Sequence, residues 1–242
     1  MTGLPDKAPP GWAKDGLTAF LDLTRRNQYA TFRNHPKTKR IVEIDALFVK
    51  VLDKPINPRP LLPMLFMLRA HASWRAAAGG AMAGQFYETN ATLRSSIETS
   101  AYGVFIGDDE NLFELWMSRH HKPENRQKVK NAFAARKVSD NIRTMSKSLA
   151  SDYESLYERL IDLGAHPNER GFTYNLNLHD IGTHRYFEQV YLHAEGPQLD
   201  LALENVAKAG MWVLHLFRLV YSAKFELLGV SATLDELRKD PI

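Results

Sequence analysis

The sequence QFYETNATLRSSIETSAYGVFI, residues 85–106, decides the fold that we expect. When it is placed on a helix, apolar side chains recur on more than one face, and the remaining side carries small residues. Its charged residues are Glu88, Arg94 and Glu98. A helix without a strongly polar side is typical of the interior of a bundle, so we predict a buried central helix over about residues 85–106.

Arg94 and Glu98 are the most informative residues of this helix. They are four positions apart, so they share a face and can form an ion pair. A charge inside a protein costs several kcal/mol unless it is paired and hydrogen-bonded. Two interpretations follow: a structural lock completed by hydrogen bonds from Tyr87 and Tyr102, or a binding site in which the same four residues hold a small polar or anionic ligand.

The composition excludes several classes of protein. The chain has 242 residues, of which 44% are hydrophobic and 24% are charged, as in a soluble globular protein. The absence of cysteine excludes disulfides, thiol nucleophiles and cysteine-ligated metals. The N-terminus lacks the apolar core of a signal peptide, and the longest apolar run, residues 209–221, is too short to cross a membrane. We therefore expect a cytoplasmic protein of bacterial type without a membrane span.

The periodicity of the rest of the chain predicts a mainly α-helical bundle, formed as a single domain over residues 1–242. Residues 1–11 are expected to be a loose N-terminal segment, and residues 54–60, KPINPRP, an extended proline-rich connector. Further helices are predicted over residues 12–33, 38–52, 61–78, 111–120, 139–163 and 197–228, and a basic helix is predicted to start at Pro123.

Two places depart from regular helical periodicity. The small residues around Gly79-Gly80 predict either that another helix approaches closely or that the helix itself bends there, and we favour a bend. From about residue 172 to residue 193, apolar and polar residues alternate on both sides of a glycine-containing turn. This alternation predicts a β-hairpin that leaves the bundle.

The stretch Arg119–Lys147 carries nine basic and two acidic residues. Such a stretch attracts phosphate backbones or an acidic partner. We favour a solvated helix surface over a nucleic-acid interface, because no aromatic residues interleave the cations of its second half to stack on bases.

Two short motifs resemble those of a known family. The inner helix contains Leu93-Arg94-Ser95 followed by Glu98, and a later helix ends in Gly164-Ala165-His166-Pro167-Asn168. Over about Leu61–Asn168 the chain resembles an uncharacterised bacterial family of all-helical domains with an LRSxxE inner helix and a His-Pro-Asn turn. The resemblance implies a helical fold and draws attention to these residues, but it implies no activity.

His166 allows two interpretations. Structurally, it caps the end of a helix, and the proline behind it prevents the helix from continuing. Functionally, Arg159, six residues and His166 resemble the loose Arg–His signature of HEPN ribonucleases, in which the pair would carry metal-independent chemistry at a ribose 2′-hydroxyl. The chain has Leu after Arg159, where that family usually has a polar residue.

The segment LHDIGTH, residues 178–184, resembles the His-Asp core of HD phosphohydrolases, which would make His179, Asp180 and His184 metal ligands. The HD fold places this pair on a helix, whereas the flanking residues here alternate as in strands. No motif for a di-iron centre, a zinc helix, a phosphate-binding loop or a dinucleotide site is present. We predict no metal and no cofactor.

The sequence thus predicts a ligand-binding or protein-interaction module, without assigned catalysis, that forms a homo-oligomer. The alternatives, in order, are a HEPN-like ribonuclease acting through Arg159 and His166, and an HD-type metal phosphohydrolase.

Overall fold

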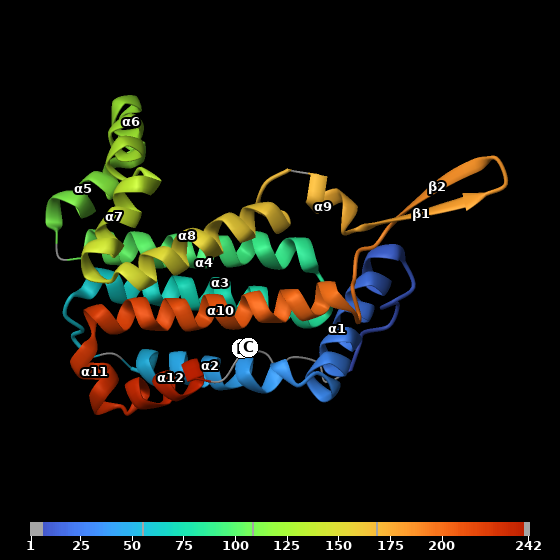
Figure 1. Ribbon diagram of the computed structural model, residues 1–242, viewed down its shortest axis with the longest axis horizontal. Helices are drawn as coiled ribbons and strands as arrows, with labels where there is room; N and C mark the ends of the chain where they lie inside the picture. The colour runs from blue at the N-terminus through green and yellow to red at the C-terminus, as the bar shows by residue number, and fades with distance from the viewer. Residues whose placement is uncertain (1–6, 55, 108, 168, 240–242) are drawn as a thin grey trace.

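The computed structural model describes residues 7–54, 56–107, 109–167 and 169–239, and it is a mainly α-helical bundle with one β-hairpin (Figure 1). The N-terminal half contains α1 (Gly16–Asn34), α2 (Lys37–Leu52), α3 (Leu61–Ala83), α4 (Phe86–Ile106), α5 (Glu110–Met117) and the short 3-10 helix η1 (Ser118–His120). The C-terminal half contains α6 (Pro123–Ala132), α7 (Ala135–Met145), α8 (Lys147–Leu160), the π-helical turn η2 (Ile161–Ala165), α9 (Glu169–Thr173), β1 (Leu176–Ile181), β2 (His184–Gln189), α10 (Pro197–Val220), α11 (Ser222–Leu227) and α12 (Val230–Lys239).

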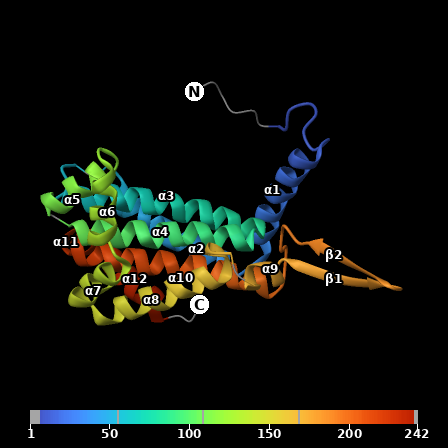
Figure 2. The same cartoon turned by 90° about the horizontal axis from the view of Figure 1, so that it is seen from above.

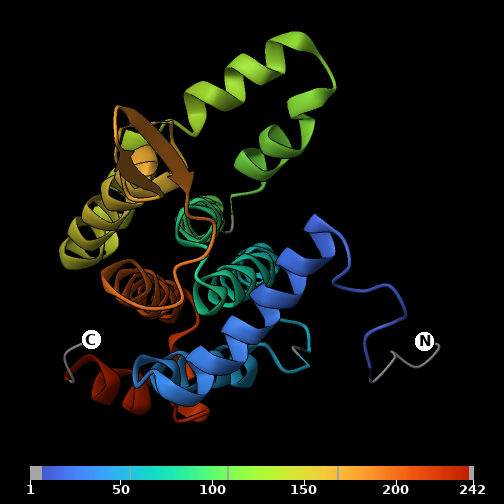
Figure 3. The same ribbon diagram turned by 90° about the vertical axis from the view of Figure 1, so that its right-hand side faces the viewer.

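The predicted central helix is confirmed as α4. It contacts α3, α10, α7, α8 and η2, and Figure 3, which looks along the bundle, shows it together with α3 and α10 nearly end-on. Figure 2 shows α5 and α6 at one end of the bundle and the hairpin with α1 at the other. The long helices α3, α4 and α10 therefore form the body of the molecule, and the elements at its two ends extend from this body.

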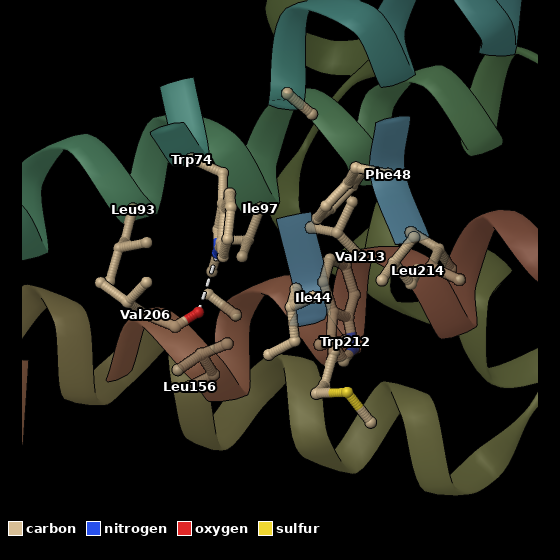
Figure 4. Close-up of a cluster of buried hydrophobic side chains, with 14 of the residues drawn as sticks. Ile44, Phe48, Trp74, Leu93, Ile97, Leu156, Val206, Trp212, Val213 and Leu214 are labelled. Atoms are coloured by element: carbon tan, nitrogen blue, oxygen red, sulfur yellow. Dashed lines mark hydrogen bonds between the residues drawn. The ribbon is translucent and has the colours of Figure 1, made fainter. Parts of the chain in front are cut away.

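Buried side chains of α2, α3, α4, α8 and α10 form the core, and within it α10 approaches α3 closely beside Trp74 (Figure 4). Gly210 on α10 makes this approach feasible, because an added Cβ would lie 2.6 Å from Nε1 of Trp74 and 2.7 Å from Cγ2 of Ile44. The indole Nε1 of Trp74 donates a hydrogen bond to the carbonyl oxygen of Val206 at 2.8 Å. A buried indole N–H needs such a partner, so α3 and α10 are joined by both packing and a hydrogen bond.

Short polar side chains begin several helices. Asp15 accepts a hydrogen bond from the backbone N–H of Thr18, and Asp109 accepts hydrogen bonds from two backbone N–H groups at the start of α5. These contacts satisfy N–H groups that have no partner inside the helix. The cap at Asp15 starts the first helix at Gly16, four residues later than predicted.

The predicted helix over residues 139–163 is wrong, because the chain breaks at Ser146. This residue is extended (φ −158°, ψ 114°), and its hydroxyl accepts a hydrogen bond from the N–H of Leu149. A continuous helix over residues 197–228 is also wrong: Tyr221 leaves the helical region (φ −116°, ψ 38°) between α10 and α11. The hydroxyl of Tyr221 donates a hydrogen bond to the carbonyl oxygen of Pro60 at 2.5 Å.

The bend favoured at Gly79-Gly80 is likewise wrong, since α3 runs through both glycines to Ala83. The close approach of neighbours explains the small residues instead. The side-chain amide of Gln28 on α1 donates to the carbonyl oxygen of Gly79 at 2.9 Å, and a Cβ on Gly80 would lie 3.1 Å from the hydroxyl of Thr89 on α4.

The predicted hairpin is confirmed, although its strands are shorter than the alternating pattern. β1 and β2 pair in antiparallel fashion, with Leu178 opposite Phe187 and Asp180 opposite Arg185. It projects from the bundle, so side chains on both of its faces are exposed (Figures 1 and 2).

The structure describes only part of the two segments that were predicted to be irregular, residues 1–11 and residues 54–60. Residues 7–11 contain no helix or strand, whereas residues 1–6 of the expected loose segment lie outside the described residues. Within the connector, residues 54 and 56–60 contain no helix or strand, and residue 55 lies outside the described part. Among the described helices, none combines the length and the apolar character that crossing a membrane requires.

Candidate ligand-binding site

A cleft of about 460 Å³ lies between α8 and α10, and single residues of α2 and α12 complete its lining. Figure 1 shows α10 with α8 on one side and α2 and α12 on the other. Its size is within the range of small-molecule sites, which is about 300–1,000 Å³.

Helical periodicity directs the residues of α8 and α10 into the cleft. The α10 residues are Lys208, Met211, Trp212 and His215, which recur at intervals of three and four and therefore lie on one face. The residues of α8 follow the same spacing from Leu149 to Arg159. Two facing helical surfaces thus form the walls.

The floor of the cleft is apolar and held in place by specific contacts. Leu149, Leu156, Met211 and Trp212 are all buried. The indole Nε1 of Trp212 donates a hydrogen bond to the carbonyl oxygen of Leu149 at 2.9 Å, and the ring of Tyr153 stacks on the indole with centroids 5.1 Å apart. These contacts fix the orientation of the indole before any ligand binds.

The rim of the cleft is cationic. We define the cationic rim as Arg40, Arg159, Lys208 and Arg238, which come from α2, α8, α10 and α12 respectively. An arginine presents a planar fork of N–H donors that matches a carboxylate or a phosphate. The rim therefore favours an oxyanion.

Glu204 on α10 neutralises part of this rim. Its carboxylate accepts a short hydrogen bond from Lys208 and lies 3.6 Å from the guanidinium of Arg159. Burial acts to raise the pKa of Glu204, but the hydrogen bond and charge of Lys208, with the charges of Lys37 and Arg159, outweigh burial and lower it. Glu204 is therefore an anion at neutral pH.

The other two cations of the rim come from α2 and α12. A guanidinium nitrogen of Arg40 donates a short hydrogen bond to the carbonyl oxygen of Leu237. Arg238 is exposed, and it forms no ion pair within the described part of the chain. Both side chains line the cleft together with Arg159 and Lys208.

His215 lies on the wall of the cleft and is only 7% exposed. Its Nε2 has no hydrogen-bond partner among the described residues. Burial, together with the charges of Arg218 and Arg238, lowers the pKa of His215 to about 4, although the carboxylate of Asp235 acts in the opposite direction. At neutral pH the imidazole is uncharged, and its free nitrogen can donate or accept a hydrogen bond, depending on the tautomer.

The structure pairs Arg94 with Glu98, but not in the interior. Their side chains are 20% and 36% exposed, and Nε of Arg94 donates to the carboxylate of Glu98 at 3.0 Å. Nη2 of Arg94 donates to the hydroxyl of Tyr157 on α8 at 2.9 Å. The prediction of a fully buried pair is therefore wrong: Tyr157 covers the pair on one side, and water reaches it on the other.

The two predicted tyrosine partners lie apart. Burial and the charge of Glu98 raise the pKa of Tyr102, whose hydroxyl donates a long hydrogen bond (3.5 Å) to the carbonyl oxygen of Phe133. Tyr87 is two helical turns from Arg94 and lines a different hollow, of about 330 Å³, beside Pro167. The four residues Tyr87, Arg94, Glu98 and Tyr102 therefore do not converge on one site.

The nuclease candidates are also placed differently. Arg159 belongs to the cationic rim, whereas His166 is an exposed residue at the end of η2 and does not line the cleft. His166 comes directly after η2, and Gly164, two positions earlier, already departs from helical dihedral angles with a φ of 154°. This position agrees with the structural interpretation of His166 as a helix cap.

The candidate metal ligands His179, Asp180 and His184 lie on the hairpin without forming a cluster. His179 and Asp180 are neighbours in β1 and point to opposite faces, and each has a partner on β2: Glu188 for the histidine and Arg185 for the aspartate. Within the described residues, no group of three potential ligands comes together.

The basic stretch Arg119–Lys147 forms the end of η1, α6, α7 and the first residue of α8. None of its residues lines the cleft, and Arg136 is almost fully exposed on α7. A nucleic-acid interface along this stretch stays a prediction.

Sequence reasoning missed the cleft. A signal was present on α10, where Lys208 and His215 are two helical turns apart, the residues between them are apolar or small, and both share a face with Trp212. No comparable signal marks Arg40 or Arg238, which join the site only through tertiary packing.

Comparisons of this chain with models of protein families, with curated proteins and with solved structures found no match. The side chains of the cleft are therefore the basis on which a function can be assigned.

Proposed function

We propose that this protein binds a small anionic molecule in the cleft between α8 and α10. The convergence of the cationic rim from four helices onto one apolar floor is the observation that carries this proposal. Cations from separate helices repel one another when they approach, so their gathering at a concave surface favours a site that receives negative charge.

The charge balance of the cleft supports an anion as the ligand. The rim supplies four cations, and the neighbouring carboxylates are Asp152 in the lining and Glu204 beside it. Among the described residues that line or adjoin the cleft, cations thus outnumber carboxylates. An anion in the cleft is attracted by these charges and is partly shielded from water, where charge-assisted hydrogen bonds are stronger.

The Arg94–Glu98 pair has a different role in this proposal. We infer that Arg94 fastens α4 to α8 through its hydrogen bond to Tyr157. A partly exposed ion pair contributes no more than about 1 kcal/mol, which suits a structural contact. The predicted cytoplasmic location and the predicted homo-oligomer remain predictions.

Binding of phenyl phosphate, measured by isothermal titration calorimetry, tests the proposal. Arg238→Gln removes one rim cation and is expected to weaken binding about 10-fold, the effect of losing a charge-assisted hydrogen bond of about 1.5 kcal/mol. Arg136→Gln is the matched control: it makes the same change of charge at a side chain that is 93% exposed on α7, away from the cleft. It is expected to change the affinity less than about two-fold.

Two results would overturn the proposal. One is the absence of binding heat at millimolar phenyl phosphate. The other is an equal loss of affinity in both variants, which would indicate general attraction of anions to a basic protein.

A further inference from the structure

A second hollow, of about 330 Å³, lies where the start of α4 meets α9 and the stem of the hairpin. This is the end of the bundle that carries the hairpin in Figure 2. We call it the aromatic hollow and define it by five of its lining residues: Tyr87, Glu88, Phe172, Asn175 and Tyr191. Among the described residues, none lines both this hollow and the cleft between α8 and α10, so the two sites are separate.

Three aromatic side chains line this hollow. Phe172 and Tyr191 are 64% and 68% exposed, and Tyr87 is partly exposed. The ring of Tyr191 is held by an edge-to-face contact with Phe20 on α1, with centroids 6.2 Å apart. Aromatic rings stabilise a fold most when they are buried, so three rings left open to solvent around one hollow indicate a place for a ligand.

The frame of the hollow is held by close contacts. The backbone N–H of Val190 donates to the carbonyl oxygen of Asn175 at 2.8 Å and closes the stem of the hairpin. The buried amide of Asn175 donates to the carbonyl oxygen of Gly171 at 2.9 Å. On the other side, a Cβ on Gly164 would lie only 2.6 Å from the carbonyl oxygen of Tyr87, so η2 and α4 are in direct contact. The hollow is therefore formed before a ligand binds.

Glu88 gives the hollow its charge. It is exposed in the first turn of α4, where the positive end of the helix dipole favours a carboxylate, and it forms no ion pair within the described part of the chain. The described lining contains no lysine, arginine or histidine. Burial lowers the pKa of the neighbouring His193, although the charge of Glu88 acts in the opposite direction, so this imidazole is uncharged at neutral pH. The hollow therefore favours a cation.

We propose that the aromatic hollow binds a small molecule with a quaternary ammonium group, whose methyl groups lie against the rings of Tyr87, Phe172 and Tyr191 and whose charge is balanced by Glu88. The face of an aromatic ring is negative and attracts a cation, and several rings together are a recurrent means of binding quaternary ammonium groups. This inference does not depend on the anion site.

The quaternary group follows from the chemistry of the lining. A primary ammonium is strongly hydrated and carries three N–H donors, which all require acceptors when the group leaves water. The hollow offers one carboxylate and mainly aromatic surface. A quaternary ammonium has no N–H donor and presents methyl groups, so it suits rings better. The volume is at the lower end of the range of small-molecule sites, about 300–1,000 Å³, and suits a molecule of the size of choline.

Choline is the probe, and 3,3-dimethylbutan-1-ol is its neutral counterpart, in which carbon replaces the nitrogen. Choline is expected to bind in isothermal titration calorimetry, and the alcohol to bind at least about 10-fold more weakly. The net charge of +3 excludes general attraction of cations to the protein as the cause of such a difference. Equal affinities, or no saturable binding of choline at millimolar concentration, would refute a cation site.

Glu88→Gln is expected to weaken choline binding about 5-fold, because it removes the carboxylate that balances the ligand. Glu110→Gln is the matched control. Glu110 is also an exposed glutamate in the first turn of a helix, but α5 lies at the opposite end of the bundle (Figure 2). It is expected to change the affinity less than about 1.5-fold. Equal effects of the two substitutions would contradict a local role of Glu88.

Phe172→Leu keeps an apolar side chain and removes the ring, and it is expected to weaken choline binding about 3-fold to 5-fold. Phe32→Leu makes the same change at a side chain that is 61% exposed on α1 and does not line the hollow, so its affinity should equal that of the parent. Because both rings are exposed, both variants are expected to fold, which thermal denaturation checks. An unchanged affinity in Phe172→Leu would overturn the role of the rings.

The same ammonium group also occurs on lipid surfaces, which a further arm of the experiment separates. The protein is expected to bind free choline and to stay in the supernatant when phosphatidylcholine vesicles are sedimented. Sedimentation with vesicles and no binding of free choline would overturn a soluble ligand. Arg238→Gln, which alters the cleft, is expected to leave choline binding unchanged, so failure of the anion site and failure of the aromatic hollow are told apart.

Discussion

Replacing Trp74 with alanine is expected to lower the free energy of unfolding by about 3–5 kcal/mol, which is the usual cost of truncating a buried aromatic side chain. Trp74 is 1% exposed and fills the space that Gly210 leaves between α3 and α10 (Figure 4). The substitution creates a cavity there and also removes the hydrogen bond from the indole to the carbonyl oxygen of Val206. Urea denaturation followed by circular dichroism measures the loss.

Trp116→Ala is the matched control for this prediction. Trp116 lies on α5 at the periphery, where it is partly exposed and packs against Phe66 with ring centroids 5.2 Å apart. Its truncation is expected to cost clearly less, because the remaining space is open to water. A similar small loss in both variants would contradict the placement of the core between α3 and α10.

Lys208→Glu is expected to abolish binding of phenyl phosphate, with a loss of affinity of at least about 100-fold. The substitution changes the charge of the rim by two units and places a second carboxylate one helical turn from Glu204, so the cleft repels an anion where it attracted one. Calorimetry measures the affinity, and thermal denaturation shows whether the variant is folded.

Lys39→Glu offers a close control. Lys39 on α2 is 85% exposed and pairs with Glu43 at the same helical spacing at which Lys208 pairs with Glu204. Both substitutions therefore change the net charge equally and break an ion pair within one helix, but only one of them alters the cleft. Comparable losses of affinity in the two variants would refute a localised site.

The central helix and the hairpin could be predicted because their signals are local. Residues 85–106 contain only three charged side chains, and this shortage of charge already predicts burial. The alternation around Gly182 predicts paired strands. The breaks at Ser146 and Tyr221 escaped prediction because apolar residues continue at helical spacing on both sides of each break. At Ser146 a side-chain cap begins the next helix, and at Tyr221 the side chain makes a tertiary hydrogen bond to Pro60.

The candidate site could be predicted only in part. Arg159 was singled out, but as the partner of His166, which does not line the cleft. The ion pair between Arg94 and Glu98 was predicted correctly. The burial of this pair depends on how much of α4 is covered by α8. Periodicity within one helix carries no information about the helix that packs against it. Arg40 and Arg238 are almost the full length of the chain apart, so no spacing rule connects them.

The most direct test of an anion site in the cleft uses the four tryptophans of the chain. Trp212 lines the cleft, whereas Trp12, Trp74 and Trp116 do not. In a ¹H–¹⁵N spectrum recorded during a titration with phenyl phosphate, the indole N–H resonance of Trp212, assigned with Trp212→Phe, should shift most and reach saturation. An unmoved Trp212 resonance, or equal shifts without saturation at all four indoles, would contradict binding in the cleft.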